Sequence, residues 1–170
     1  PPRTGNRHGG LSLCPYNVYP ASDGFVAIIC NNNKHWLALL TAMQRSDLAD
    51  REDMHTMRDR VGQMDAIDEL IGQWSQTFTR DALFAHLTTH RVPNAPVRTL
   101  GEVMHDTHLH ERGVLFEIDH PSQGRIIVCR SPLHFKGLRQ VDYRPSPGYG
   151  EDNEKILGET LNIDAETRAL

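Results

Sequence analysis

Two strand–turn–strand patterns, separated by a long stretch of helical periodicity, constrain the fold of this 170-residue chain most strongly. The first covers residues 16–30, where the β-prone run Phe25–Cys30 follows a turn at Ser22-Asp23-Gly24. The second covers residues 114–129, with its turn at residues 119–124. Runs of this kind, bounded by turn residues, are typical of β-hairpins. We therefore predict an α/β fold, in which β-hairpins and several helices form a small α+β domain, with the strand from Phe25 buried on both faces.

The helical stretch begins at the asparagines of Asn31-Asn32-Asn33. Asn32 or Asn33 can cap a helix, because a side-chain amide oxygen accepts hydrogen bonds from the free N–H groups of the first turn. The apolar positions of this helix begin at Trp36 and recur at helical spacing through Leu40 and Met43. We predict that this face packs on the core and that Trp36 anchors it.

Further helices are indicated by apolar spacing and by capping residues. Apolar residues recur at intervals of three and four from Met57 to Trp74, with a break near Gly62 and a restart capped by Asp65. Thr79 can cap another helix, which must end before residues 92–97 because that segment contains two prolines.

The C-terminal third carries weaker signals. Thr99 and Glu102 match a capping box and predict a short helix. Residues 137–150 are rich in proline and glycine and predict an exposed crossing segment. A helix is expected around Glu151–Leu157, with a second helix start at Asp164.

Charge and cysteine content exclude several classes of partner. The net charge is −4 and the Lys and Arg residues are scattered, so nucleic acid is not expected as a partner. No apolar run approaches the ~18 residues of a membrane span, and no signal peptide is recognised, so we expect no membrane association and a cytoplasmic location. Cys14, Cys30 and Cys129 include no Cys-x-x-Cys pair and are interpreted as small apolar residues.

Ten histidines form the clearest excess in the composition, but their spacing does not predict a metal site. His105, His108 and His110 lie at i, i+3 and i+5, which does not converge on one ion as a His-x-x-x-His pair does. His86 and His90 have the converging spacing, yet their helix already has an apolar face, and we interpret them as surface residues. We predict no bound metal.

No nucleophile with an adjacent base can be recognised, so no catalytic residue is assigned. Residues 1–15 contain several glycines and prolines with little apolar periodicity, and they are interpreted as a connecting segment. Within it, Gly9-Gly10 can either let the backbone approach a ligand closely or simply let a linker turn. The residues alone favour the linker.

Several separated motifs match one protein family in the same order along the chain. They are Arg3-x-Gly5-Asn6, Asp23-Gly24, Asn33-x-x-Trp36, Arg60-Val61, Val92-Pro93-x-x-Pro96-Val97, Arg112-Gly113, Asp119-His120-Pro121, Ser131-Pro132-Leu133 and Gly150-Glu151. Together these motifs cover nearly the whole chain. The chain resembles the C-terminal portion of class III CoA transferases, the family of formyl-CoA transferase, carnitine CoA transferase and bile-acid-inducible protein F.

The resemblance implies a domain organisation. Family members have a Rossmann-like large domain, made from the N-terminal portion plus the extreme C-terminus, and a small α/β domain between these parts. Residues 16–135 would be the small domain, residues 136–170 the return linker and last helices of the large domain, and residues 1–15 the preceding linker. Because the chain starts at Pro1 without Met, we expect the N-terminal part of the large domain to be absent. The resemblance also implies an interlocked homodimer.

The resemblance further implies a reaction. Family members transfer CoA between a thioester and a carboxylic acid through intermediates on an aspartate of the large domain. No residue of this chain matches that aspartate, so we expect the chain alone to be inactive. An acyl-CoA and a small carboxylic acid are the expected partners. The CoA thioester serves as co-substrate, and no tightly bound cofactor is expected.

Four residues are candidates for substrate binding. His8, Gly9 and Gly10 lie where formyl-CoA transferases have a glycine-rich loop that shields the intermediates, although only two glycines and no following Gln are present here. Asn33 lies where the racemases of the family have a glutamate. A neutral amide cannot act as acid or base, which favours a transferase. The alternatives are a racemase-type acyl-CoA isomerase of the α-methylacyl-CoA kind and a noncatalytic binding or assembly module with the same fold.

Overall fold

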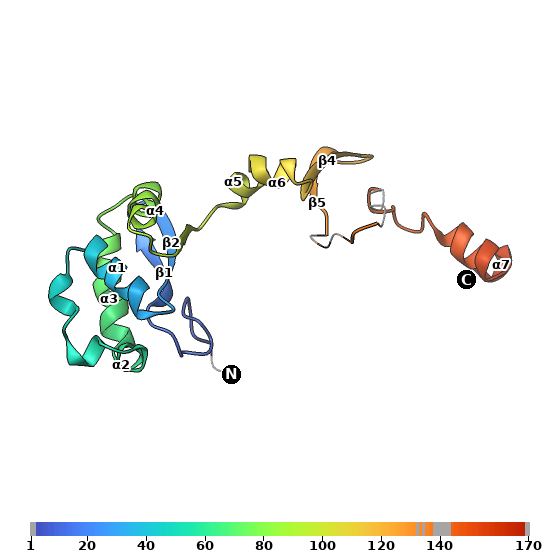
Figure 1. The fold of residues 1–170 in the computed structure, drawn as a ribbon. Coiled ribbons are helices and arrows are strands. Elements are labelled where there is room, and N and C mark those ends of the chain that lie inside the picture. The colour runs from blue at the N-terminus through green and yellow to red at the C-terminus, as the bar shows by residue number, and fades with distance from the viewer. Residues whose placement is uncertain (1–2, 132, 134, 138–143, 169–170) are drawn as a thin grey trace. The chain divides into compact units, whose positions relative to one another are not determined.

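In the computed structural model the chain forms two compact units, Pro1–Arg98 and Thr99–Leu170 (Figure 1). The first unit contains a three-stranded sheet with its helices, and the second contains a separate two-stranded sheet. The structure describes residues 3–131, 133, 135–137 and 144–168. This mixture of helices with small antiparallel sheets confirms the predicted fold class.

The sheet of the first unit is antiparallel, in the order β1-β2-β3. β1 (Tyr16–Ala21) and β2 (Gly24–Ile29) form the predicted hairpin, in which Tyr19 pairs with Val26. β3 (Asn94–Pro96) pairs with β2 and was not predicted, because it lies in the proline-containing segment. Proline is tolerated there since β3 is an edge strand.

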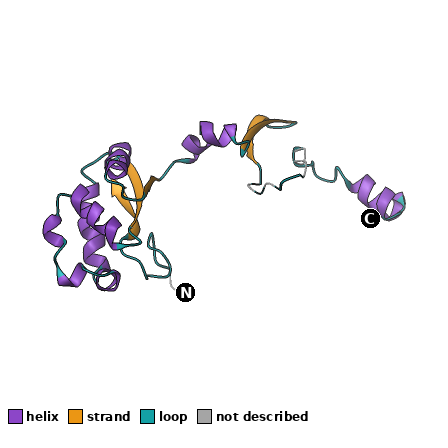
Figure 2. Ribbon diagram, viewed as in Figure 1, coloured by secondary structure: helices purple, strands orange, loops and turns teal. Residues whose placement is uncertain are grey.

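Helices cover one face of this sheet (Figure 2). They are α1 (Asn33–Ala42), the 3-10 turns η1 (Ser46–Leu48) and η2 (Glu52–Met54), α2 (Met57–Gly62), α3 (Met64–Ser75) and α4 (Arg80–Thr89). Helix α3 contacts β1, and α4 contacts both β2 and β3. The predicted break near Gly62 separates α2 from α3.

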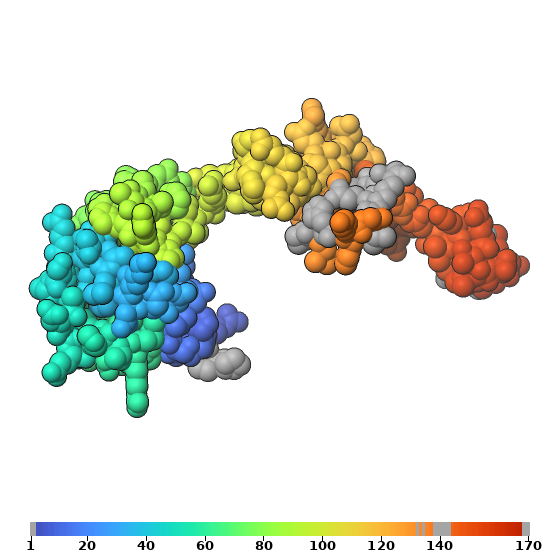
Figure 3. Space-filling model, in the orientation of Figure 1, coloured from blue at the N-terminus to red at the C-terminus, as the bar shows by residue number. Residues whose placement is uncertain are grey.

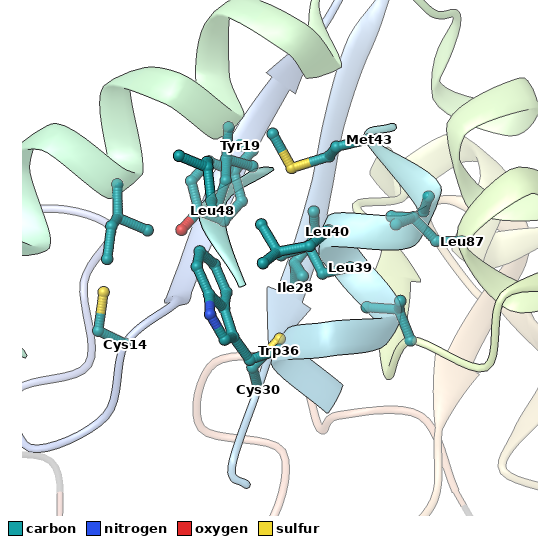
Figure 4. Packing of buried hydrophobic residues seen from close by; sticks show 14 of the residues in the cluster. Cys14, Tyr19, Ile28, Cys30, Trp36, Leu39, Leu40, Met43, Leu48 and Leu87 are labelled. Atoms are coloured by element: carbon teal, nitrogen blue, oxygen red, sulfur yellow. The ribbon is translucent and has the colours of Figure 1, made fainter. Parts of the chain in front are cut away.

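The core lies between the sheet and the helices, where side chains from β1, β2 and α1 gather (Figure 4). Trp36 is 2% exposed, which confirms its predicted place in the core. Cys14 and Cys30 are fully buried, as expected of small apolar residues, but Cys129 is exposed, and the same interpretation is wrong for it. Other members are Tyr19, Val26, Ile28, Leu39, Leu40, Ala42, Met43, Leu48, Met54, Ile67, Ile71, Leu83, Leu87 and Val92.

The burial of β2 differs from the prediction. Val26 and Ile28 are buried against the helices, whereas Ala27 and Ile29 are only half-buried and Phe25 is 47% exposed. The strand is therefore not buried on both faces. Alternate side chains of a strand point to opposite faces, and helices of this unit cover only one of them.

Most predicted caps are present. Asn32, rather than Asn33, caps α1, and its Oδ1 accepts from the N–H of His35 at 2.9 Å. The side chain of Thr79 caps α4 as predicted. Asp65 does not cap α3, because this helix begins at Met64, directly after α2.

The second unit contains two short helices, α5 (Leu100–Met104) and α6 (Thr107–Glu111), followed by the predicted hairpin of β4 (Leu115–His120) and β5 (Gly124–Cys129). The predicted Thr99–Glu102 capping box begins α5. The helix expected around residues 151–157 occurs as a π-helix, η3 (Glu154–Thr160). The last element is α7 (Ala165–Arg168). Among the described residues, no helix has the length and apolar character needed to cross a membrane.

Candidate functional site

Arg60 on α2 is a fully buried arginine in the first unit. Its Nε donates to the carbonyl oxygen of Cys14 at 3.1 Å, and its Nη1 donates to the carbonyl oxygens of Met54 and His55, both at 3.0 Å. Its Nη2 donates to the side-chain Oδ1 of Asn33 at 2.9 Å. This one guanidinium therefore ties the N-terminal segment and the loop before α2 to the first residue of α1.

The environment of Arg60 is unusual for a charged group. No carboxylate of the described part of the chain forms an ion pair with it, and its carbon Cζ lies 5.4 Å from the centre of the Trp36 ring. Burial lowers the pKa of Arg60, because the charged form loses its hydration. Carbonyl oxygens replace that hydration, and the ring face adds a cation–π contact. The start of α1 is thus held by a buried positive charge.

The candidate residues His8, Gly9 and Gly10 form a surface turn in the N-terminal segment, which is blue in Figure 3. The His8 ring stacks on Tyr16 with ring centres 4.9 Å apart, and the Gly10 N–H donates to His8 Nδ1 at 3.2 Å. A Cβ on Gly10 would lie 2.6 Å from His8 Cε1, whereas a Cβ on Gly9 would meet nothing within 4 Å. The absence of a Cβ at Gly10 therefore lets the His8 ring lie close to the backbone, whereas no neighbour requires glycine at position 9.

The same segment is anchored to α3 through Arg7. Its Nε lies 2.6 Å from Asp68 and its Nη1 lies 2.7 Å from Asp65. Asp68 also accepts from Asn17 Nδ2 at 3.0 Å and from the Tyr19 hydroxyl at 2.5 Å. Hydrogen bonds to Asp65 and Asp68 raise the pKa of Arg7, and burial is the main cause of the raised pKa of Tyr19. The described part of this segment, residues 3–15, thus has fixed contacts that its composition did not indicate.

The turn at His8, Gly9 and Gly10 and the side chain of Asn33 are not linked to one another in the described part of the structure. Within the described residues, no hydrogen bond or ring contact links Asn33 to His8, Gly9 or Gly10. A cavity of about 510 Å³ lies beside the N-terminal turn, with Arg7 and the start of α3 in its lining.

Arg60 is the residue that reasoning from the sequence missed. It appeared only as part of a family motif, since arginine side chains are seldom fully buried. No pattern in the sequence marks Arg60 as buried, because the carbonyl oxygens that it binds are brought together only by the fold.

Four histidines, His86, His90, His105 and His110, contact main-chain carbonyl oxygens. His86 is half-buried rather than on the surface, because its Nε2 lies 2.9 Å from the carbonyl oxygen of Ala42 and its ring stacks on Phe78. His90 is half-buried as well, with its Nδ1 2.9 Å from the carbonyl oxygen of His86, so the interpretation of both histidines as surface residues was wrong. Nδ1 of His105 and Nε2 of His110 each lie 2.8 Å from main-chain carbonyl oxygens of α5.

The fold and the sequence both match known proteins. A solved structure of a CaiB/BaiF family protein from Brucella suis superposes with a TM-score of 0.71 and 30% sequence identity, covering 94% of this chain and 40% of that one. A succinyl-CoA:mesaconate CoA-transferase from Haloarcula hispanica is 33% identical over 149 residues, which are 87% of this chain and 35% of the relative. A formyl-CoA:oxalate CoA-transferase from Streptomyces coelicolor is 27% identical over 99% of this chain and 42% of its own length.

These similarities define a mixed α/β chain of the CaiB/BaiF kind. The model of CoA-transferase family III matches residues 1–153, and the chain belongs to that family. The resemblance inferred from the separated motifs is therefore confirmed. The chain spans about two-fifths of the length of the curated relatives it matches.

Proposed function

We propose that this chain is the C-terminal portion of an acyl-CoA:carboxylate CoA-transferase. In that reaction the thioester bond of the donor breaks, its acyl group leaves as a carboxylate, and CoA forms a new thioester with the acceptor acid. The observation that carries the proposal is the family match over residues 1–153, together with relatives that are named CoA-transferases. The covalent steps are assigned to an aspartate outside this chain.

The proposed organisation follows the family resemblance. Residues 16–135 form the small domain, residues 136–170 return to the large domain, and two complete proteins interlock as a cytoplasmic homodimer. Part of the return segment, residues 138–143, lies outside the described residues. No tightly bound cofactor takes part, because CoA enters and leaves as a substrate.

We assign two roles in substrate handling to this chain. The turn at His8, Gly9 and Gly10 covers the reacting groups and limits the access of water, since a backbone without Cβ atoms can close over a ligand. Its exposure and the open space around Gly9 support this role. Asn33 contacts the substrate. Its amide cannot transfer protons as a racemase carboxylate would, so a racemase is not favoured.

Assay of the full-length protein tests the proposal. Succinyl-CoA and formyl-CoA are offered as donors, with mesaconate, oxalate, glutarate and malate as acceptors, because relatives are named for these compounds. We expect a new acceptor thioester by mass spectrometry. The 170-residue chain alone should give none, since loss of a nucleophile reduces rates by a factor on the order of 10⁶. Racemisation of a 2-methylacyl-CoA without any transfer would refute the proposal.

A further inference from the structure

The amide of Asn33 has a fixed orientation. The atom that faces Arg60 Nη2 at 2.9 Å must be the amide oxygen, because a guanidinium group only donates hydrogen bonds and has no acceptor. The amide NH₂ group is therefore the other end of the side chain. Chemistry alone settles this choice, independently of how the two ends of an amide are told apart.

Arg60 cannot easily release Asn33 from this orientation. The guanidinium is fully buried, and three of its other four N–H donors are engaged by the carbonyl oxygens of Cys14, Met54 and His55. Because the guanidinium is planar, these contacts fix the direction of Nη2. The oxygen of Asn33 is thus occupied by a group that has no alternative position.

The NH₂ group of Asn33 has no structural task within the described part of the chain. Asn33 is exposed, and no described acceptor takes a hydrogen bond from its Nδ2. The residue is not needed as a helix cap either, since Asn32 supplies that contact to the N–H of His35. Its partnership with Arg60 also polarises the amide, because hydrogen bonds in series strengthen one another.

We propose that Asn33 is a hydrogen-bond donor to a substrate oxygen, with Arg60 as the positioning residue that holds it in that role. The inference rests on the proposed transferase function. The partner oxygen belongs to a carboxylate or a thioester carbonyl, which share the ability to accept from an N–H group. Asn33 therefore recognises oxygen acceptors, and it rejects a substrate that presents a donor at this point.

The substitution Asn33→Asp distinguishes donation to the substrate from a role that is limited to the contact with Arg60. In Asn33→Asp, one carboxylate oxygen still accepts from Arg60, and the interaction gains a charge. The other oxygen replaces the NH₂ group and carries no proton at neutral pH, so it faces the substrate oxygen as a second acceptor. Asn33→Ala removes both ends of the side chain at once.

The test compares Asn33→Asp, Asn33→Ala and Asn32→Asp in the full-length protein. Asn32→Asp adds the same charge one residue away and keeps the helix cap, because Asp and Asn cap equally well. We expect Asn33→Asp to raise KM by about tenfold or more, as loss of a hydrogen bond to a charged group implies, without lowering the melting temperature. Asn32→Asp should match the wild type. A rise in the KM of the acid identifies its carboxylate as the partner, and a rise in the KM of acyl-CoA identifies the thioester carbonyl.

Each other outcome counts against the inference. If Asn33→Asp has the wild-type KM for both substrates, Asn33 serves only Arg60. Equal losses in Asn33→Asp and Asn32→Asp would show a general charge effect. A lower melting temperature for Asn33→Asp than for Asn33→Ala would contradict the orientation assigned to the amide. If the wild-type protein transfers CoA between no pair of substrates, the proposed function fails first, and this inference fails with it.

Discussion

Replacing Arg60 by lysine tests whether the buried guanidinium organises the first unit. Arginine reaches four acceptors here with a planar group, whereas a lysine ammonium is a single point with three donors. Lysine can stay charged but cannot reach the carbonyl oxygens of Cys14 and Met54 together with Asn33. Asn33 is exposed, so water can replace the donor that it loses. The carbonyl oxygens of Cys14 and Met54 accept buried hydrogen bonds, so water cannot replace their donors.

The expected loss follows from those two buried carbonyls. An unsatisfied buried polar group costs about 1–3 kcal/mol, and this is the expected cost if the single-point ammonium leaves one of the two carbonyls without a donor. Loss of the contact with the Trp36 ring adds to this, at about 0.5–2 kcal/mol for a cation–π pair. The total is a large share of the roughly 5–15 kcal/mol that keeps a typical domain folded.

Urea denaturation followed by circular dichroism measures the free energy of unfolding of Arg60→Lys and wild type. Arg58→Lys is the matched control, because Arg58 lies on the same helix and is exposed. It should change stability by less than about 0.5 kcal/mol. A loss below about 1 kcal/mol for Arg60→Lys would refute the reasoning, since the buried carbonyls would then have found other donors.

Four further outcomes are expected. Trp36→Ala should lower the free energy of unfolding by about 3–5 kcal/mol, and an unchanged melting temperature would contradict the packing of α1. Burial raises the pKa of Cys14 and of Cys30 to about 12, so a thiol reagent at pH 8 should label only Cys129 in the native chain, and rapid labelling of all three would contradict the core. Because these pKa values lie above the ordinary 9.0, stability should be complete below about pH 9 and fall toward pH 12, as alkaline titration followed by circular dichroism would show. In the full-length protein, Gly10→Val should keep the wild-type fold but lower CoA transfer or raise thioester hydrolysis; if CoA release with and without acceptor acid is unchanged, the turn is an ordinary linker.

Local patterns in the sequence correctly predicted the two hairpins and the helices that begin at capping residues. The strands of both hairpins alternate or form short apolar runs between turn residues, and the caps at Thr79 and Thr99 lie directly before their helices. β3 could not be predicted in this way, because it depends on pairing with β2, which is far away in the sequence. Pro93 before it and Pro96 within it argued against a strand, and Pro96 is tolerated because β3 lies at the edge of the sheet.

The candidate site was only partly predictable for a similar reason. Asn33 was identified through a family position, but its orientation depends on Arg60, which lies on another helix. No periodicity marks that arginine as buried, because its acceptors are main-chain carbonyls supplied by other segments of the chain. Long-range polar contacts of this kind depend on the assembled fold.

Two prolines on the outer strands of the three-stranded sheet leave its internal hydrogen bonds intact. The N–H of Cys30 donates to Pro15 O, and the N–H of Val97 donates to Phe25 O. Because alternate residues of an antiparallel strand point toward and away from a neighbour, Pro20 on β1 and Pro96 on β3 occupy outward-facing positions.

The edge of β3 therefore lacks one N–H group that an incoming strand would need, whereas Pro20 on β1 faces α3, where Ser75 Oγ donates to Pro20 O at 2.6 Å. An exposed edge next to a strand as apolar as β2 is a template for intermolecular sheet growth and amyloid-like association. Pro96 interrupts that template on β3 without disturbing the internal ladder, since the missing donor faces outward. Pro96 is thus placed to act as a gatekeeper against aggregation, a task separate from any contact with substrate.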